Sequence, residues 1–167
     1  MLGEMQLGWM KDQKVGIARI FNVYGGGEPL NENVHVIPAL IRKAILYPKE
    51  DFIVWGDGNQ SRCLLYVSDC VDALMRLEGR ISKGSPLIVN LGSDESVSVK
   101  DMAEKIVEIS GKNITPKYDP TKPAGPRSRT ANIARARALL GWSPTVDLDE
   151  GLKRTYLWTE KRLRGSR

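Results

Sequence analysis

Residues 86–92 (PLIVNLG) constrain the fold more than any other segment of the sequence. They are apolar at nearly every position rather than at alternate positions, which is typical of a strand buried on both faces of a parallel sheet. Residues 14–24 (KVGIARIFNVY), rich in β-branched and aromatic side chains, predict a second strand. Helical periodicity follows near residues 2, 33, 68, 98, 132 and 147. Strands that alternate with helices predict an α/β fold.

The sequence has no glycine-rich turn of the kind that opens a dinucleotide-binding sheet. Neither G-x-G-x-x-G nor G-x-x-G-x-x-G occurs. The glycine run 25–27 follows a predicted strand, but a loop with proline and asparagine comes next instead of a helix. We therefore expect the glycine-rich cofactor unit to be absent and no cofactor to be bound by this chain alone.

Length and composition fit one globular domain, residues 1–167. The chain is 41% hydrophobic and 27% charged, which is ordinary for a water-soluble domain. No apolar run reaches the roughly 18 residues that a membrane span requires. The first residues show no basic stretch followed by an apolar one, as a signal peptide would. We expect a cytoplasmic protein with no membrane partner.

Cysteine and histidine are too few for a zinc site. Cys63 and Cys70 form no C-x-x-C pair, and His35 is the only histidine. We expect no metal, and reduced, partly buried thiols.

The net charge of +5 raises the question of nucleic-acid binding. The positive charge gathers late in the chain, in residues 122–137 and in the tail, without interleaved aromatic residues or a zinc-finger spacing. We expect no nucleic-acid partner, because a pocket for a small phosphorylated ligand explains the excess charge more simply.

Five segments, taken in order, resemble the extended short-chain dehydrogenase/reductases of the NAD-dependent epimerase/dehydratase family, which act on nucleoside-diphosphate sugars. They are residues 19–27 (RIFNVYGGG), 36–44 (VIPALIRKA), 54–74 (VWGDGNQSRCLLYVSDCVDAL), 89–106 (VNLGSDESVSVKDMAEKI) and 125–158, which include LGWSP. The sequence departs from the family pattern at Gly26, where proline is usual, and at Leu64, where an aromatic residue is usual. The nearest likenesses are to GDP-mannose 3,5-epimerases and GDP-fucose synthases. The resemblance implies a partial Rossmann-type sheet plus the small C-terminal substrate-binding region.

The resemblance also implies that the catalytic unit lies upstream. Residues 1–4 (MLGE) match the stretch that follows the family's catalytic Y-x-x-x-K, so we expect the chain to begin just after that lysine. Tyr118 and Lys122 have the same spacing, but Pro120 and Pro123 break the helix that the pair requires. We expect the chain to be inactive alone, with NAD(P) bound by the full-length family member.

The resemblance assigns three residues to the sugar nucleotide, each with an alternative. Arg62 would bind the pyrophosphate through its guanidinium fork, or form a surface ion pair. The Asn22 amide would donate to a phosphate oxygen, or hold its own loop. Trp55 would stack on the nucleobase, or belong to the core.

Arg127 and Arg129 flank a serine in a loop where the family places a phosphate-binding arginine. The form here is close to the G-x-R-G-R of GDP-mannose 3,5-epimerases. Either arginine, or Lys122, could make the contact.

His35 and Val36 lie in a segment that resembles the one carrying an acid for epimerisation in GDP-fucose synthases. His35 could be that acid, a substrate contact or an ordinary surface residue. Val36 stands nearest to the place where GDP-mannose 3,5-epimerases use a lysine.

Three interpretations of function follow. The first is the substrate-binding part of a sugar-nucleotide epimerase or dehydratase, with a nucleoside-diphosphate sugar as ligand and a cofactor-binding N-terminal half as partner. The second is a stand-alone binding or interaction module derived from that family, and the third is a nucleic-acid binder. Because two predicted strands lack sheet neighbours, we expect a homo-oligomer.

Overall fold

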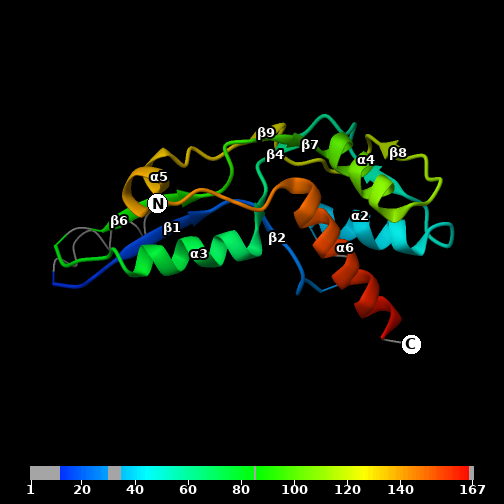
Figure 1. Cartoon of the computed structure of the whole chain (residues 1–167). Helices are drawn as coiled ribbons and strands as arrows, with labels where there is room; N and C mark the ends of the chain where they lie inside the picture. Colours follow the sequence, from blue (N-terminus) through cyan, green and yellow to red (C-terminus); the bar gives the residue numbers. More distant parts are fainter. Residues whose placement is uncertain (1–11, 30–34, 85, 166–167) are drawn as a thin grey trace.

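The chain folds around two hydrophobic cores that lie side by side (Figure 1). The computed structural model describes residues 12–29, 35–84 and 86–165. One core lies in a sheet lobe and the other in a helical lobe. The helix expected at residues 2–10 lies outside the described residues.

The sheet lobe is built on a parallel pair of strands, β1 (Gly16–Ile20) and β6 (Leu87–Leu91), in register from Gly16 opposite Leu87 to Ile20 opposite Leu91. Helix α3 (Val67–Glu78) and helix α5 (Ala134–Leu140) pack against the strand pair and against each other, around one core (Figure 1). The expected α/β class and partial parallel sheet are confirmed. Cys63 and Cys70 are buried in this lobe and form no disulfide.

The helical lobe consists of α2 (Val36–Leu46), α4 (Val99–Ser110) and α6 (Leu148–Arg164), which pack against one another. A short parallel pair, β3 (Ile53–Trp55) and β8 (Lys117–Asp119), lies beside them. Local signals explain two of these helices: the Ser98 hydroxyl accepts from the Asp101 amide at 3.0 Å, and the Asp147 carboxylate accepts from the Glu150 amide at 2.9 Å.

Short strands connect the lobes. β4 (Ser61–Arg62) lies between β7 (Val97–Ser98) and β9 (Ser128–Arg129) in a three-stranded sheet. β2 (Val23–Tyr24) pairs with β5 (Leu65–Tyr66). The predicted strand at residues 14–24 is therefore two strands, separated at Asn22, whose φ of 26° is incompatible with extended backbone.

The helix expected near residue 68 is α3, which begins at Val67 with Tyr66 at its N-cap position. The Asp69 carboxylate lies inside the first turn and accepts hydrogen bonds from Thr145 and Val146.

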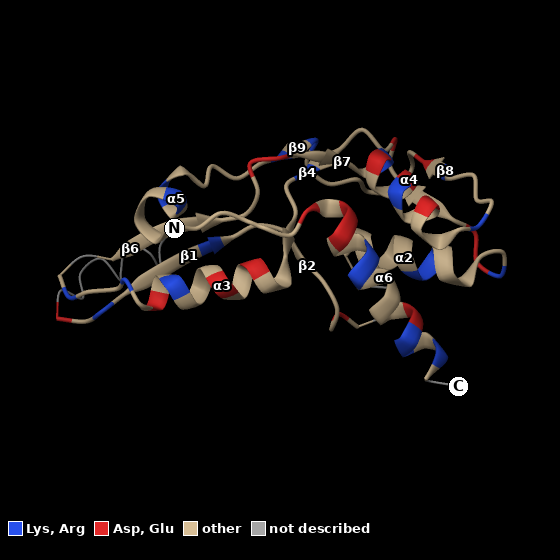
Figure 2. Cartoon of the chain, in the orientation of Figure 1, with Lys and Arg blue, Asp and Glu red and all other residues tan. Residues whose placement is uncertain are grey.

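Charged side chains of both signs alternate along α3, α4 and α6 in Figure 2. Within the described ranges, no helix is long and apolar enough to cross a membrane, and no group of three or more histidine, cysteine, aspartate or glutamate side chains could hold a metal ion.

A lysine that follows helix α4, Lys112, contacts the C-terminal end of α2. The Lys112 ammonium donates to the carbonyls of Ala44, Ile45 and Tyr47 at 2.8, 2.6 and 3.0 Å. These carbonyls have no helical partner, and the positive charge also complements the helix dipole. Lys112 therefore fixes the end of a helix that, as described below, lines a cavity.

Replacing Lys112 by methionine is expected to lower the free energy of unfolding by about 1–3 kcal/mol, because it removes charged hydrogen bonds to partly buried carbonyls. Urea unfolding followed by circular dichroism measures the change. Lys153→Met, an exposed residue of α6, removes the same charge and is expected to change stability by less than about 0.5 kcal/mol. Equal effects of the two substitutions would show that the three carbonyls do not depend on Lys112.

A close approach of α6 to β2 depends on a glycine. A methyl group at Gly151 would overlap the hydroxyl of Tyr24, which is 4% exposed. Gly151→Ala is therefore expected to destabilise the chain by about 1–3 kcal/mol, although alanine is the better helix former by about 1 kcal/mol.

Gly79→Ala provides the matched control, since its nearest neighbours lie 3.7 Å from the added atom and its φ is −65°. Thermal unfolding of both variants measures the contrast. A Gly151→Ala protein as stable as Gly79→Ala would contradict the close packing of α6 on Tyr24.

Candidate functional site

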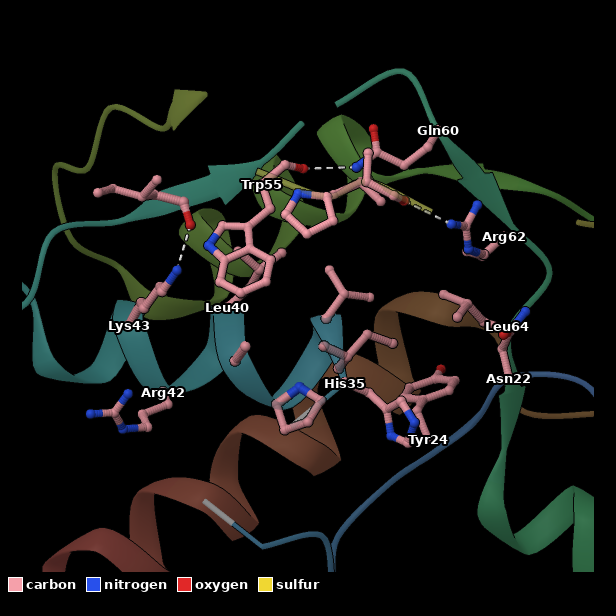
Figure 3. A pocket seen from close by; sticks show the side chains of 18 of the residues that line it. Asn22, Tyr24, His35, Leu40, Arg42, Lys43, Trp55, Gln60, Arg62 and Leu64 are labelled. Atoms are coloured by element: carbon pink, nitrogen blue, oxygen red, sulfur yellow. Dashed lines mark hydrogen bonds between the residues drawn. The ribbon is translucent and has the colours of Figure 1, made fainter. Parts of the chain in front are cut away.

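A cavity of about 970 Å³ lies between α2 and the strands that lead from the sheet lobe into the helical lobe. Its walls come from three places in the chain (Figure 3): the end of β1 with β2, the face of α2 from His35 to Lys43, and the segment from β3 to Leu64. Pro123 and Ala124, in the loop before β9, close one edge.

Trp55 ends β3 and lies in this cavity. Its side chain is 50% exposed, so the alternative of a core tryptophan is wrong. In Figure 3 the indole lies over α2, near Leu40. The turn that follows requires glycine, because Gly56 has a φ of 84° and an added Cβ would lie 2.7 Å from Cβ of Ala124. This close approach brings the Ala124 loop to the edge of the cavity.

Gln60 holds the backbone of Trp55 in place. Its Nε2 donates to the Trp55 carbonyl at 2.9 Å, and the residue is 6% exposed. Its Oε1 is buried without a partner among the described residues. Sequence reasoning noted this glutamine as part of a motif without giving it a role.

Arg62 lies on the opposite wall from α2 and is partly buried. Its Nη1 donates to the carbonyls of Ser61 and Pro126, both at 2.7 Å, and its Nη2 donates to the Ala124 carbonyl at 3.1 Å. It has no carboxylate partner in the described part of the chain, so the alternative of a surface ion pair is wrong. Burial, and then the nearby charge of Arg129, lower the pKa of Arg62. Three of the five guanidinium N–H groups are used by backbone carbonyls, two of them in the loop of Ala124 and Pro126, which leaves donors for an anion.

Asn22 uses its amide on its own surroundings. The Nδ2 donates to the Cys63 carbonyl at 2.9 Å, and the Asn22 carbonyl accepts from the Leu65 amide at 3.2 Å. Of its two predicted roles, the structure shows the one that holds the loop, although the side chain also lines the cavity.

His35 and Val36 lie at the N-terminal end of α2 and line the cavity. The imidazole is 87% exposed, caps no helix amide, and lies with Nδ1 3.0 Å from Oε2 of Glu28. Val36 is the first residue of the helix.

Arg127 and Arg129 are not among the residues that line the cavity. Both are exposed, and their carbonyls accept from the amides of Ser61 and Cys63 at 2.9 and 3.0 Å. Arg129 lies directly opposite Arg62 in the paired strands. The structure thus brings Asn22, His35, Val36, Trp55 and Arg62 to one cavity. It leaves Arg129 in the neighbouring strand β9 and Arg127 just before that strand. Lys122 is also exposed.

Sequence reasoning missed a charged group at the far end of the α2 face. The Lys43 ammonium donates to the Ile53 carbonyl at 2.6 Å, and Nη1 of Arg42 donates to Oε1 of Glu50 at 3.0 Å. Burial lowers the pKa of Lys43, and the charge of Glu50 opposes that shift. The position of Lys43 could have been predicted from helical periodicity, because Val36, Leu40 and Lys43 are spaced so that they share one face of the helix.

Comparison with known proteins shows several relatives. The chain is 36% identical to GDP-L-fucose synthase 1 of Arabidopsis thaliana over 146 residues, which cover 85% of the chain and 44% of that protein. It is 31% identical to GDP-mannose 3,5-epimerase 1 of Oryza sativa subsp. indica over 147 residues, 88% of the chain and 38% of that protein. These relatives confirm the two predicted likenesses.

The fold matches solved structures as well. UDP-glucuronic acid 4-epimerase from Bacillus cereus, solved in complex with UDP-glucuronic acid and NAD, superposes with a TM-score of 0.75 at 28% identity. The match covers 89% of this chain and 46% of that one. The chain therefore spans less than half the length of each of these three proteins.

A family model provides the remaining evidence. The model for the NAD dependent epimerase/dehydratase family matches residues 4–92, more than half of the chain. Together with the relatives and the Rossmann-like fold, this match shows that the chain belongs to the NAD-dependent epimerase/dehydratase family.

Proposed function

We propose that this chain forms the sugar-nucleotide-binding part of an NAD(P)-dependent enzyme that epimerises or dehydrates a nucleoside-diphosphate sugar. One observation carries the proposal: a guanidinium with unused donors, Arg62, and a half-exposed indole, Trp55, line the same cavity. The relatives named above support the ligand class, since their names and complexes refer to guanosine or uridine diphosphate sugars.

Arg62 binds the pyrophosphate in this proposal. Its contacts with the Ala124 and Pro126 carbonyls fix the guanidinium before a ligand arrives. A pre-oriented fork loses little conformational entropy on binding a phosphate. Arg129, on the adjacent strand, adds positive charge near the same wall.

Trp55 stacks on the nucleobase. A tryptophan that is 50% exposed in a cavity offers an apolar face that a flat ring can cover. The hydrogen bond from Gln60 fixes the backbone from which the indole projects.

His35 lies at the end of the cavity where α2 begins and is the residue of this chain suited to proton transfer. We assign it to the sugar, as an acid or as a contact, in the complete enzyme. Val36 and Asn22 line the same region.

In this proposal the glycines after β2 do not form a cofactor-binding turn. They serve packing instead, because a Cβ at Gly25 would lie 2.6 Å from Val67 and one at Gly26 would lie 2.8 Å from Trp158. We therefore assign NAD(P) to a cofactor-binding N-terminal half and derive no chemical step through it.

The alternative is a stand-alone binding or oligomeric interaction module. Apolar side chains on the outer face of α3 favour it, since Val71 is 54% exposed and Met75 is 63% exposed. In the described residues β1 also pairs with one strand only. Either a second copy or the N-terminal half could cover these surfaces, and light scattering of the purified chain distinguishes a homo-oligomer from a monomer. We place the protein in the cytoplasm, where free buried cysteines are common.

The binding proposal predicts that Arg62→Lys weakens the binding of a sugar nucleotide by about 10-fold, because an ammonium keeps the charge but loses the fork. Isothermal titration calorimetry with GDP-, UDP-, dTDP- and CDP-sugars measures the loss on the sugar nucleotide that binds. Arg80→Lys, an exposed residue beyond α3, is the control and is expected to leave the affinity unchanged. Unchanged affinity in Arg62→Lys would remove Arg62 from the site.

Because the proposal assigns NAD(P) binding to another half of the enzyme, we expect this chain alone to show no turnover with NAD(P) and any of these sugar nucleotides. It also predicts no binding of NAD in the same calorimeter. Product detected by mass spectrometry above a heat-denatured control would contradict the assignment of the chemistry to another half.

A further inference from the structure

Helix α3 carries a stripe of exposed apolar side chains that nucleotide binding does not use. Its members are Val67, Val71, Leu74 and Met75, which we call the apolar stripe. They recur at positions i, i+4, i+7 and i+8 and therefore share one side of the helix. None of them is among the residues that line the cavity.

The apolar stripe lies on the flank of α3 that faces away from α5. Arg76 marks the other flank, since its Nη1 donates to the Gly141 carbonyl at the end of α5 at 2.8 Å. Val71 lies about 140° around the helix from Arg76, at 100° per residue. Helix α5 packs chiefly on β6, whereas α3 lies over both β1 and β6. The apolar stripe is therefore on the side of β1.

The backbone of β1 is open on that same side. The chain bonds to β6 at both ends of β1, through the Val15 carbonyl and the Phe21 amide. Backbone groups of successive residues point to opposite sides of a strand, so those of Gly16, Ala18 and Ile20 point away from β6. Within the described ranges β1 pairs with no second strand. We call these three residues the β1 edge.

The opposite edge of the sheet is closed by a side chain. The Leu87 amide and the Leu91 carbonyl bond toward β1, so the backbone of Ile88 points outward. Its carbonyl accepts from Nε of Arg135 at 3.0 Å. A side chain that occupies an edge acceptor opposes the addition of a strand there. A further strand is therefore favoured at the β1 edge.

A second copy of the chain would cover the β1 edge and the apolar stripe together. If β1 pairs antiparallel with β1 of the second copy, a two-fold axis runs through the sheet and both α3 helices lie on the same face. Neighbouring strands are about 4.8 Å apart, so two helices that each lie over β1 and β6 would have axes about 10 Å apart. Packed helices are separated by roughly 8–10 Å. The spacing of the sheet thus brings the two stripes into contact.

The position of α3 along β1 sets the register of such a pair. A Cβ at Gly16 would lie 3.2 Å from Cγ of Leu77, so these residues are level with each other. Because α3 leads into β6 and β6 is parallel to β1, α3 runs antiparallel to β1. Ala18 lies about 7 Å farther along the strand, which corresponds to about four residues of helix. The centre of the β1 edge, Ala18, is therefore level with Ala73.

This register matches apolar and charged groups of the two copies. Two-fold symmetry about Ala18 places Val71 of one copy opposite Met75 of the second copy, and these are the two most exposed members of the apolar stripe. It also places the exposed Glu78 opposite Ser68, in the first turn of the second α3. Free amides and the helix dipole favour a carboxylate at that end of a helix.

We propose that two copies of this chain associate through the β1 edge and the apolar stripe. The association joins two two-stranded sheets into one, in the order β6–β1–β1–β6, with the two α3 helices packed side by side on one face. The inference does not depend on the ligand of the cavity, so a failure of nucleotide binding leaves it standing.

Sedimentation velocity over a range of protein concentrations tests the association. The chain is expected to change from monomer to dimer as its concentration rises. Val71→Asp places a carboxylate against Met75 of the second copy and is expected to raise the Kd of the dimer at least about 10-fold. Leu157→Asp, on α6 and 55% exposed, is the control and is expected to leave that Kd unchanged. Equal effects of the two substitutions, or a monomer at every concentration, would overturn the proposal, and a monomer would assign these surfaces to the N-terminal half.

A charge pair tests the register. Met75→Lys alone is expected to weaken the dimer, as Val71→Asp does. The two substitutions in one chain are expected to restore most of the association, because the carboxylate at position 71 then faces the ammonium at position 75 of the second copy. A double variant that associates no better than either single variant would contradict the antiparallel register.

Hydrogen exchange followed by NMR tests the pairing of the strands. The amides of Ala18 and Ile20 are expected to exchange more slowly in the dimer than in monomeric Val71→Asp, since they become hydrogen bonded in the joined sheet. A dimer in which these amides exchange as rapidly as in the monomer would show that the β1 edge is not part of the interface.

Discussion

The buried carboxylate of Asp69 connects the two lobes, and the geometry of the cavity depends on it. It is 5% exposed and accepts from the Thr145 amide and hydroxyl at 3.0 and 2.8 Å and from the Val146 amide at 2.9 Å. Its own carbonyl accepts from the indole of Trp142 at 3.2 Å. A buried carboxylate without such donors would be strongly unfavourable. The path of the chain between α5 and α6 is thus tied to the first turn of α3, and α6 enters the helical lobe at a fixed place beside Tyr24.

The cavity walls are fixed in the same way, by side chains that donate to backbone carbonyls of distant segments. Lys112 does so at the end of α2, Gln60 behind Trp55 and Arg62 at the loop of Ala124. Each contact satisfies an acceptor that secondary structure leaves unpaired. The spare donors of Arg62 and Lys43 lie on the cavity, and so does Gln60, whose buried Oε1 has no partner among the described residues.

Much of the fold could be predicted from the sequence because its determinants are local. Ser98 and Asp147 cap the helices that follow them through contacts only three residues long, and the apolar run around Val89 needs no partner to be recognised. The break of the first strand at Asn22 was not predictable, since its amide is paired with Cys63, 41 residues away. Asp69 pairs with Thr145 and Val146, which lie 76 and 77 positions later in the sequence. Hydrophobic periodicity does not indicate such distant contacts. In the site, Arg62 and Trp55 were found through motif resemblance, whereas Lys43 and Glu50 were missed because helix α2 and the turn after it combine them only in three dimensions.

The two ends of the cavity differ in how much of their chemistry this chain supplies. The part of the cavity around Trp55 has a half-exposed indole with a guanidinium on one side and charged side chains on the other, and these charged groups are held by hydrogen bonds within the described residues. At the other end, the imidazole of His35 is 87% exposed and paired with Glu28. Tight binding requires the first kind of surface, while chemistry at a sugar carbon requires water to be excluded and several groups to be fixed around the reacting atom. In the proposed function this chain therefore recognises the nucleotide, and the partner half completes the surroundings of the sugar.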